Sequence, residues 1–337
     1  MIQEPTNNPQ QQAPDIARAL LVLDNYEWLL SEAGAAGIEI IPLKGIDMLR
    51  TVYADHLDRP VRDIDVLCHS EEDCRKLVER LCQNGYRLEF PFSMRPKVLA
   101  SKRKVSLLSG NPLRVNVDVH TAIVTKKFFS QSVASFNTDA LARCEHGQME
   151  SFDRWLFLAQ HAAFHFFSDA KWVRDLVLIY ERFSSEERTI LWQRASQYGF
   201  RRVMLAALYH VYKSVPQELQ ATLKALNPTA TELRFLSFVW QYDRPVTRNL
   251  TGRIVSAYWE FAFVDSCMNR WRNWCSLVFP TRGVLTNMYR IKNPLTLCVF
   301  YPLNFFVSVA TSFFFWCLFA FVTVKAGIRL RHAPSVF

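Results

Sequence analysis

The chain has 337 residues, which is enough for two domains or for one domain with appendages. Half of the residues are hydrophobic and 14% are aromatic, so a membrane segment has to be sought. The net charge is +9, but residues 251–337 hold nine Lys and Arg against Glu260 and Asp265, and this end alone carries +7. Because the basic excess lies in the tail, the body shows no sign of a nucleic-acid groove, and we expect no nucleic-acid partner.

The first part of the chain predicts a helix and a short strand. Residues 1–14 are rich in Gln, Asn and Pro and carry no apolar core, so we expect a disordered lead-in without a signal peptide. Residues 15–33 repeat apolar side chains at helical spacing, and residues 38–43 form a β-branched run typical of a buried strand. This strand leads into Lys44 and Gly45. We assign residues 15–150 to one α/β domain.

Two carboxylates follow within residues 57–68. Asp63 and Asp65 stand one residue apart, and alternate side chains of a strand point to the same face. Ile64 and Val66 would then face a core. Paired carboxylates on a rigid strand repel each other unless a cation lies between them, which is typical of a divalent-metal site. The alternative is a pair of solvated turn residues.

A capped helix and a hairpin come next. Ser70 and Asp73 predict a capping box at the start of a helix that Gly85 ends. Residues 105–108 and 113–120, joined by Ser-Gly-Asn-Pro, predict a β-hairpin. In its second arm, Asp118 lies on the polar face of the strand. This carboxylate either completes the metal site or is a solvent-facing residue of an edge strand.

Residues 151–250 predict a helical domain. Within it, His161 and His165 are four residues apart and share one helix face. Such a pair can bind zinc, but the Glu of the metalloprotease motif is missing. The alternative is that both histidines pack between helices or join a polar network.

The C-terminal end predicts a membrane anchor. Residues 295–324 carry no charge over a length sufficient to span a bilayer, although a buried core helix is the alternative. Residues 251–294 mix basic and aromatic side chains, as at a membrane interface, and residues 325–337 form a basic tail. We therefore expect membrane lipids as partners of this segment. The eight cysteines form no Cys-x-x-Cys motif, and we expect a cytoplasmic catalytic part.

An ordered series of short motifs resembles one family. The motifs are Leu43-Lys44-Gly45, Tyr53, Arg59-Pro60, Arg62-Asp63-Ile64-Asp65, Gly85-Tyr86, Val117-Asp118-Val119-His120, His161 to His165, and Trp172 to Asp175. The series is similar to the uncharacterised nucleotidyltransferase family within the DNA polymerase β-like superfamily. This resemblance implies an α+β fold, in which a small mixed-sheet nucleotidyltransferase core precedes the helical domain and the C-terminal transmembrane helix.

The resemblance also implies roles for individual residues. Asp63, Asp65 and Asp118 would hold Mg²⁺ or Mn²⁺, and Asp118 would help to activate the acceptor hydroxyl. Lys44 and Gly45 would lie near the nucleotide phosphates. Ile46 stands where the family usually has Ser or Gly, and Lys44 or Arg62 would compensate with charge. Four further residues match the family pattern without an assigned role: Arg59, His120, His161 and Asp175.

The function that follows is a membrane-anchored nucleotidyltransferase with a two-metal mechanism. It would transfer a nucleoside monophosphate from a nucleoside triphosphate to a hydroxyl-bearing acceptor and release pyrophosphate. Two alternatives stay open. One is a nucleotide-binding or regulatory module of little or no activity tethered to the membrane, and the other is a structural membrane protein whose carboxylates are surface residues.

Overall fold

The computed structural model describes residues 9–54, 59–91, 93–96, 99–100, 103–124, 130–241 and 263–265, together with the single residues 268, 275, 302, 305, 306, 309, 310 and 313. This part of the chain contains ten helices and one five-stranded sheet, which confirms the α+β class. The chain divides into two compact units. Unit 1 comprises Met1–Lys126, Ala134–Leu158 and Arg174–Arg182, and unit 2 comprises Lys127–Val133, Ala159–Val173 and Phe183–Phe337. The domain borders expected at residues 150 and 250 stay predictions.

The sheet of unit 1 is mixed. Its strands are β1 (Ile40–Leu43), β2 (Ile64–Cys68), β3 (Tyr86–Leu88), β4 (Lys104–Ser109) and β5 (Val117–His120), in the spatial order β1-β2-β5-β4-β3. Strands β2 and β5 are parallel, and the other neighbours are antiparallel. The predicted hairpin is confirmed as the pair β4 and β5. The parallel pairing places the two strands that carry Asp65 and Asp118 next to each other.

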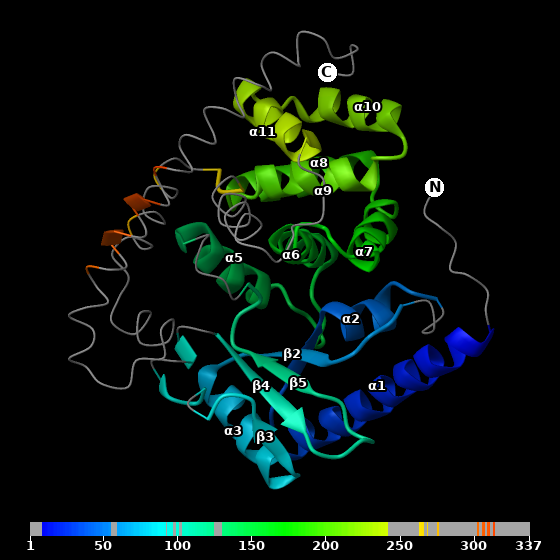
Figure 1. The fold of residues 1–337 in the computed structure, drawn as a ribbon, viewed down its shortest axis with the longest axis vertical. Coiled ribbons are helices and arrows are strands. Elements are labelled where there is room, and N and C mark those ends of the chain that lie inside the picture. Colours follow the sequence, from blue (N-terminus) through cyan, green and yellow to red (C-terminus); the bar gives the residue numbers. More distant parts are fainter. Residues whose placement is uncertain are drawn as a thin grey trace. The chain divides into compact units, whose positions relative to one another are not determined.

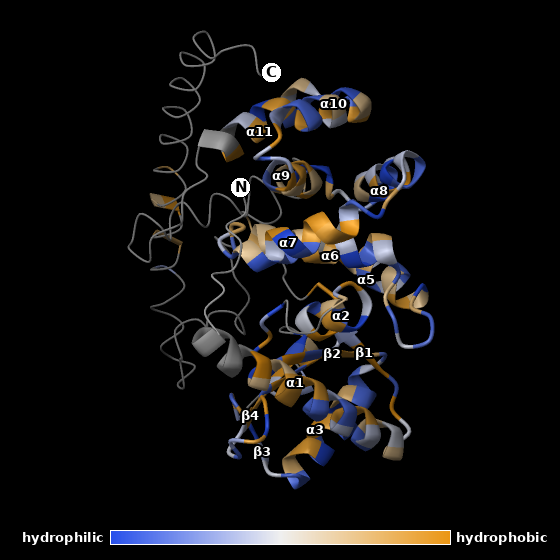
Figure 2. Ribbon diagram, turned by 90° about the vertical axis from the view of Figure 1, so that its right-hand side faces the viewer, coloured by the Kyte–Doolittle hydropathy of each residue, from blue (hydrophilic) through white to orange (hydrophobic). Residues whose placement is uncertain are grey.

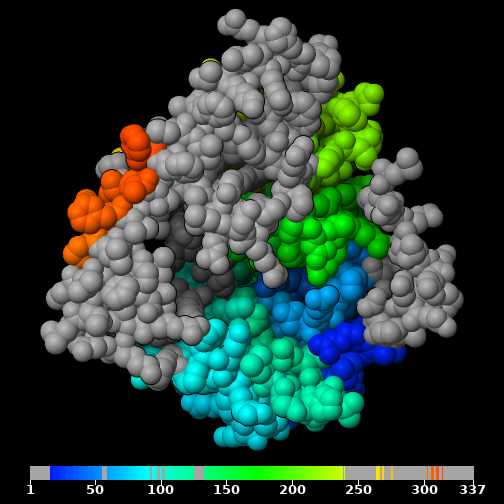
Figure 3. All heavy atoms as spheres, viewed as in Figure 1, coloured from blue at the N-terminus to red at the C-terminus, as the bar shows by residue number. Residues whose placement is uncertain are grey.

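One face of the sheet is covered by α1 (Pro9–Ala35) and α3 (Glu71–Gln83), as Figure 1 shows. Val66, Val117 and Val119 point into this core together with Tyr26 of α1 and Leu77 of α3. Hydrophobic and hydrophilic residues alternate along α3, as expected for a helix with one face on a sheet (Figure 2). The opposite side of α3, in cyan, lies at the surface of unit 1 (Figure 3).

The ends of α1 and α3 follow local chemistry. Ser70 caps α3, because its hydroxyl accepts the backbone N–H of Asp73 at 3.0 Å, and Gly85 follows the helix with φ +88°. The Ser70 cap and the Gly85 end are confirmed, but the capping box is not complete, because the Asp73 carboxylate accepts the hydroxyl group of Ser70 and not its backbone N–H. Helix α1 begins at Pro9, six residues before the predicted start, so the expectation of a disordered lead-in is wrong for residues 9–14. Gln is a good helix former, and this run extends the helix that follows it. Residues 1–8 lie outside the described part.

The other helices of unit 1 are α2 (Lys44–Thr51) and α5 (Ser130–Ala142), with parts of α6 (Ser151–Phe164) and α7 (Ala170–Tyr180). Helix α2 packs against α1, because Ile46 and Leu49 share the core cluster with Tyr26 and Arg50 donates to the hydroxyl group of Tyr26 at 3.3 Å. The indole N–H of Trp155 in α6 donates to the carbonyl of Leu176 in α7 at 3.1 Å. Trp155 is fully buried, so this bond satisfies a polar group inside the core.

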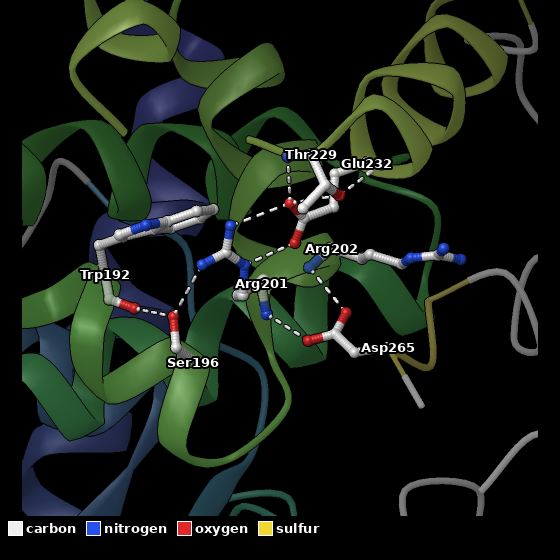
Figure 4. A network of polar contacts seen from close by, with 7 residues as sticks. All are labelled: Trp192, Ser196, Arg201, Arg202, Thr229, Glu232 and Asp265. Carbon is white, nitrogen blue, oxygen red and sulfur yellow. Dashed lines mark hydrogen bonds and ion pairs between the residues drawn. The ribbon is translucent and has the colours of Figure 1, made fainter. Parts of the chain in front are cut away.

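Unit 2 contains α8 (Ser185–Gln197), α9 (Arg201–Val211), α10 (Pro216–Leu226) and α11 (Ala230–Gln241). Residues 202–209 of α9 are all buried, so α9 forms the centre of this unit. Arg201 makes two hydrogen bonds with Glu232 of α11, and the carboxylate of Asp265 accepts the backbone N–H groups of Arg201 and Arg202 (Figure 4). Asp265 thereby satisfies donors at the start of α9 from a position far along the chain.

The expected membrane segment, residues 295–324, lies outside the described residues apart from single positions. The same is true of most of the interface segment 251–294 and of all of the tail 325–337. Within the part of the chain that is described, no helix combines the length and the apolar character needed to cross a bilayer.

Candidate metal centre

Asp65 and Asp118 are direct neighbours in the sheet. They pair in register across the parallel strands β2 and β5, and strands so paired lie about 4.8 Å apart. Both side chains therefore leave the sheet on the same face, opposite to the valine-rich core. Asp65 is only 4% exposed, and its carboxylate has little water around it. Two carboxylates this close repel each other unless positive charge lies beside them.

His120 joins the two carboxylates. It follows Asp118 by two residues on β5 and so shares its face, and its Nε2 lies 2.9 Å from Oδ1 of Asp65. Because a carboxylate only accepts, Nε2 carries the proton, and the buried Nδ1 has no hydrogen-bond partner within the described chain. Ligand atoms of Asp65, Asp118 and His120 lie within 4.8 Å of one another, and no other such group of three occurs among the described residues.

This group suits a divalent cation. Carboxylate oxygens are the usual protein ligands of Mg²⁺ and Mn²⁺, whereas an imidazole nitrogen is more usual for Zn²⁺, Fe²⁺, Ni²⁺ and Cu²⁺. Oδ2 of Asp65 and Oδ1 of Asp118 accept no hydrogen bond from the described part of the chain, and Nδ1 of His120 is a buried polar atom without a partner. The group could therefore hold a divalent cation, with an imidazole in addition to the two carboxylates.

Two lysines accompany the carboxylates. Nζ of Lys44 lies 2.5 Å from Oδ1 of Asp65, and Nζ of Lys104 lies 2.6 Å from Oδ2 of Asp118. Lys44 begins α2, whereas Lys104 begins β4 and is in register with His120. Each carboxylate of the centre thus has an ammonium group of its own.

These charges shift the pKa values of the centre. Burial opposes the charge of Lys44, but the carboxylates of Asp65, Asp118 and Asp63 outweigh it and raise the pKa of the amine. Burial would raise the pKa of Asp65, but Lys44 and His120 hold it far below its ordinary value. Burial lowers the pKa of His120 despite its bond to Asp65, so the imidazole is neutral at pH 7. Asp65 is therefore an anion held between a cation and a neutral donor.

Asp63 lies at the edge of this centre. It precedes β2, and the period of two places its side chain on the same face as Asp65. Asp63 as a residue is exposed, but partial burial of its carboxyl group and repulsion from Asp65 and Asp118 raise its pKa. The group of three within 4.8 Å includes His120 and not Asp63. The metal role of Asp63 stays a prediction.

The turn at Lys44 and Gly45 is tightly packed. Lys44 adopts a left-handed backbone conformation with φ 52°. A Cβ atom at Gly45 would lie 2.7 Å from a guanidinium nitrogen of Arg59 and 2.9 Å from a methyl group of Val61, so only glycine fits. Ile46 is fully buried, and its side chain offers no hydroxyl group to a phosphate.

Arg59 and Asp175 form a buried ion pair beside this turn. The guanidinium group donates to both carboxylate oxygens at 2.7–3.1 Å, and the hydroxyl group of Tyr53 donates to Oδ1 at 2.9 Å. Arg59 is 3% exposed and Asp175 is fully buried. Both residues therefore support the loop that leads to Asp63. Arg62, in contrast, is exposed, and its carbonyl group accepts a hydrogen bond from Arg18.

Sequence reasoning missed two further contributors. Lys104 stands one residue before the predicted strand, and only its register with His120 reveals its place. Asp47 of α2 is buried and accepts a hydrogen bond from Arg154 of α6 at 2.7 Å, which fixes α2 and with it Lys44. A charged residue on the apolar face of a short helix was the available signal for Asp47.

The residues of the candidate centre belong to unit 1, whereas His161 does not. It belongs to unit 2, where its ring contacts those of His165 and Trp172 at centroid distances of 4.8 and 5.2 Å. Neither histidine takes part in a group of three ligand-bearing residues within the described chain. Ring contacts of this kind agree with the alternative in which both histidines pack between helices.

A known protein family resembles this chain. The sequence matches the model of the family described as "uncharacterised nucleotidyltransferase" over residues 10–215, a range that holds every residue of the candidate centre. No curated protein matches the chain. The family match covers more than half of the sequence and agrees with the predicted resemblance. The chain therefore belongs to the uncharacterised nucleotidyltransferase family.

Proposed function

We propose that this protein is a metal-dependent nucleotidyltransferase that moves a nucleoside monophosphate from a nucleoside triphosphate to a hydroxyl-bearing acceptor. The observation that carries the proposal is the register of Asp65 with Asp118, with His120 within ligand distance of both. The family membership supports the same chemistry. A cation bound by these residues would neutralise phosphate charge and polarise the reacting oxygen atoms.

The residues of the chain have distinct tasks in such a reaction. The acceptor oxygen attacks the α-phosphorus, the bond from that phosphorus to the bridging oxygen breaks, and pyrophosphate leaves with the bonding electrons. Asp118 takes the proton of the acceptor hydroxyl. Lys44 and Lys104 stabilise the charge on the phosphate oxygens, because both ammonium groups already lie at the carboxylates. The two-ion arrangement on Asp63, Asp65 and Asp118 stays a prediction.

A labelling experiment tests this function. Purified protein is incubated with α-labelled nucleoside triphosphates, Mg²⁺ or Mn²⁺, and a membrane-plus-cytosol extract. We expect one class of extract molecule to acquire label, and we expect EDTA, Asp65→Asn and Asp118→Asn to abolish the transfer. The matched control is Asp24→Asn, which removes an exposed carboxylate from α1. Equal labelling by Asp118→Asn would reject the assignment.

We further propose that residues 295–324 anchor the protein in a membrane, with the catalytic part in the cytoplasm and residues 251–294 at the lipid interface. The uncharged length of this segment supports the proposal. The full chain should sediment with membranes after alkaline carbonate washing. Leu318→Arg should release it, because a charge in the hydrocarbon layer is costly. Release of the unaltered chain by carbonate would contradict the anchor.

A second candidate function is a nucleotide-binding module without turnover. The buried Ile46 favours it, since the hydroxyl group usual at this position is absent from the turn. Calorimetry separates the two functions. A module would bind a nucleoside triphosphate with Mg²⁺ and release no pyrophosphate in the presence of the extract, whereas the enzyme would release it.

A further inference from the structure

We propose that Lys44 and Lys104 act as fixed counter-cations, so that the centre binds a single divalent cation and the ammonium group of Lys104 takes the place of a second ion. This inference rests on the proposed function and concerns how the same site is charged. It departs from the two-metal mechanism that the family resemblance implied.

Each of the two lysines is paired with one carboxylate oxygen. Lys44 and Lys104 each engage one oxygen of one carboxylate, at 2.5 and 2.6 Å. The oxygens left without a hydrogen bond from the described chain are Oδ2 of Asp65 and Oδ1 of Asp118, and His120 adds a nitrogen. One ligand atom from each of Asp65, Asp118 and His120 lies within 4.8 Å of the other two, which is room for one shared ion. A second ion at Asp118 would have to displace the ammonium group of Lys104.

The charges of the centre also favour a single ion. At their formal charges, Asp63, Asp65 and Asp118 contribute three negative charges, and the paired Lys44 and Lys104 contribute two positive ones. The centre therefore has one net negative charge before any ion binds. One divalent cation reverses it to one positive charge, and a second would leave three positive charges close together. Like charges at such short range oppose that arrangement strongly.

The position of Lys104 also suits the role of a counter-cation. Its backbone is in register with His120 on the neighbouring strand, so its side chain leaves the sheet on the face of the carboxylates. The side chain is 35% exposed, whereas that of Asp118 is 15% exposed. Lys104 thus reaches from a half-buried carboxylate to solvent. A lysine held this way supplies a positive charge that needs no free metal.

Counting bound Mn²⁺ tests the inference. Free Mn²⁺ is measured by electron paramagnetic resonance in titrations of the full chain, and we expect one ion per chain. Lys104→Met removes the ammonium group while keeping an unbranched stem, and we expect this variant to bind a second ion at least tenfold more tightly than the unaltered chain does. Lys104→Arg keeps the charge and should still bind one ion.

Controls separate this inference from the proposed function. Lys76→Met removes an exposed lysine paired with Glu72 on α3 and should leave the count at one. Two bound ions in the unaltered chain would overturn this inference but not the proposed function. The same holds if Lys104→Met, with unaltered circular dichroism, still binds a single ion with unchanged affinity. If Lys104→Met does not fold, Lys104→Gln is measured in its place against the same criteria. No bound Mn²⁺ in the unaltered chain would overturn the metal centre as well.

Discussion

Arg59 and Asp175 form a bidentate, fully enclosed ion pair although 116 residues separate them in the sequence. The pair joins the loop before β2 to helix α7 within unit 1. The same guanidinium group presses against Gly45, and the same carboxylate accepts the hydroxyl group of Tyr53. One buried contact therefore supports both the turn that carries Lys44 and the segment that leads to Asp63 and Asp65.

Asp175→Asn should destabilise the protein strongly. The change leaves the charge of Arg59 buried without its counter-ion, which costs about 3–5 kcal/mol in comparable sites. The free energy of unfolding in urea measures this loss. Glu79→Gln is the control, because Glu79 is exposed on α3, and it should change stability by less than about 0.5 kcal/mol. Equal stability of the two variants would show that the ion pair does not hold the loop.

Gly45→Ala should be destabilising although alanine favours helices. The new methyl group would lie 2.7 Å from Arg59 and 2.9 Å from Val61, and the required shift costs about 1–3 kcal/mol. Gly34→Ala is the matched control, since no atom lies within 4 Å of a Cβ atom there and the residue lies in α1. That change should be neutral or stabilising by up to about 1 kcal/mol. Thermal unfolding distinguishes them, and a stabilised Gly45→Ala protein would contradict the packing.

Much of the fold follows from local sequence. The valine alternation of β5, the Ser70 cap and the hairpin are short-range signals, and the structure confirms each of them. Helix α5 was not predicted, because its apolar side chains do not form a clear stripe over residues 130–142. The alternation of apolar and polar residues along a strand predicts which face of that strand is buried. It does not predict which strand pairs with it.

The site was predicted only in part for the same reason. The sequence placed Asp65 and Asp118 on the polar faces of two strands, but their contact depends on the parallel pairing of β2 with β5. His120 looked like a polar residue of an outer strand, yet it is 2% exposed and its Nε2 lies 2.9 Å from Asp65. Lys104 and the partner of Arg59 come from distant segments, and no local pattern identifies them.

The stability of unit 2 should depend on the ionisation of Asp265. Burial raises the pKa of Asp265 from 3.8 to about 6, although backbone N–H groups of α9 oppose the shift. Between these values the folded state binds more protons than the unfolded state, so stability decreases as the pH rises from about 4 to about 6, by at most about 1.4 kcal/mol per pH unit. Asp265→Asn lacks this dependence. Urea unfolding across this range should show the stability of the original chain falling relative to that of the variant, and parallel curves would contradict the assignment.

Mn²⁺ should raise the melting temperature through the metal centre. An ion at one hundred times its dissociation constant stabilises the folded state by about 2.7 kcal/mol, which corresponds to a rise on the order of 5–10 °C. Asp118→Asn should abolish the rise, Asp24→Asn should keep it, and EDTA should reverse it. Differential scanning calorimetry measures the effect. An equal rise in Asp118→Asn would place the bound ion elsewhere.

We propose that Asp65 and its neighbours support metal-dependent nucleotidyl transfer. The most direct measurement is the rate of pyrophosphate release from nucleoside triphosphates with Mg²⁺ and extract, compared between the unaltered chain, Asp65→Asn and Asp24→Asn. We predict that Asp65→Asn lowers the rate at least about a hundredfold, because it weakens the charge that holds the cation and the phosphates in place, while Asp24→Asn keeps the full rate. Equal rates in all three proteins would contradict the account.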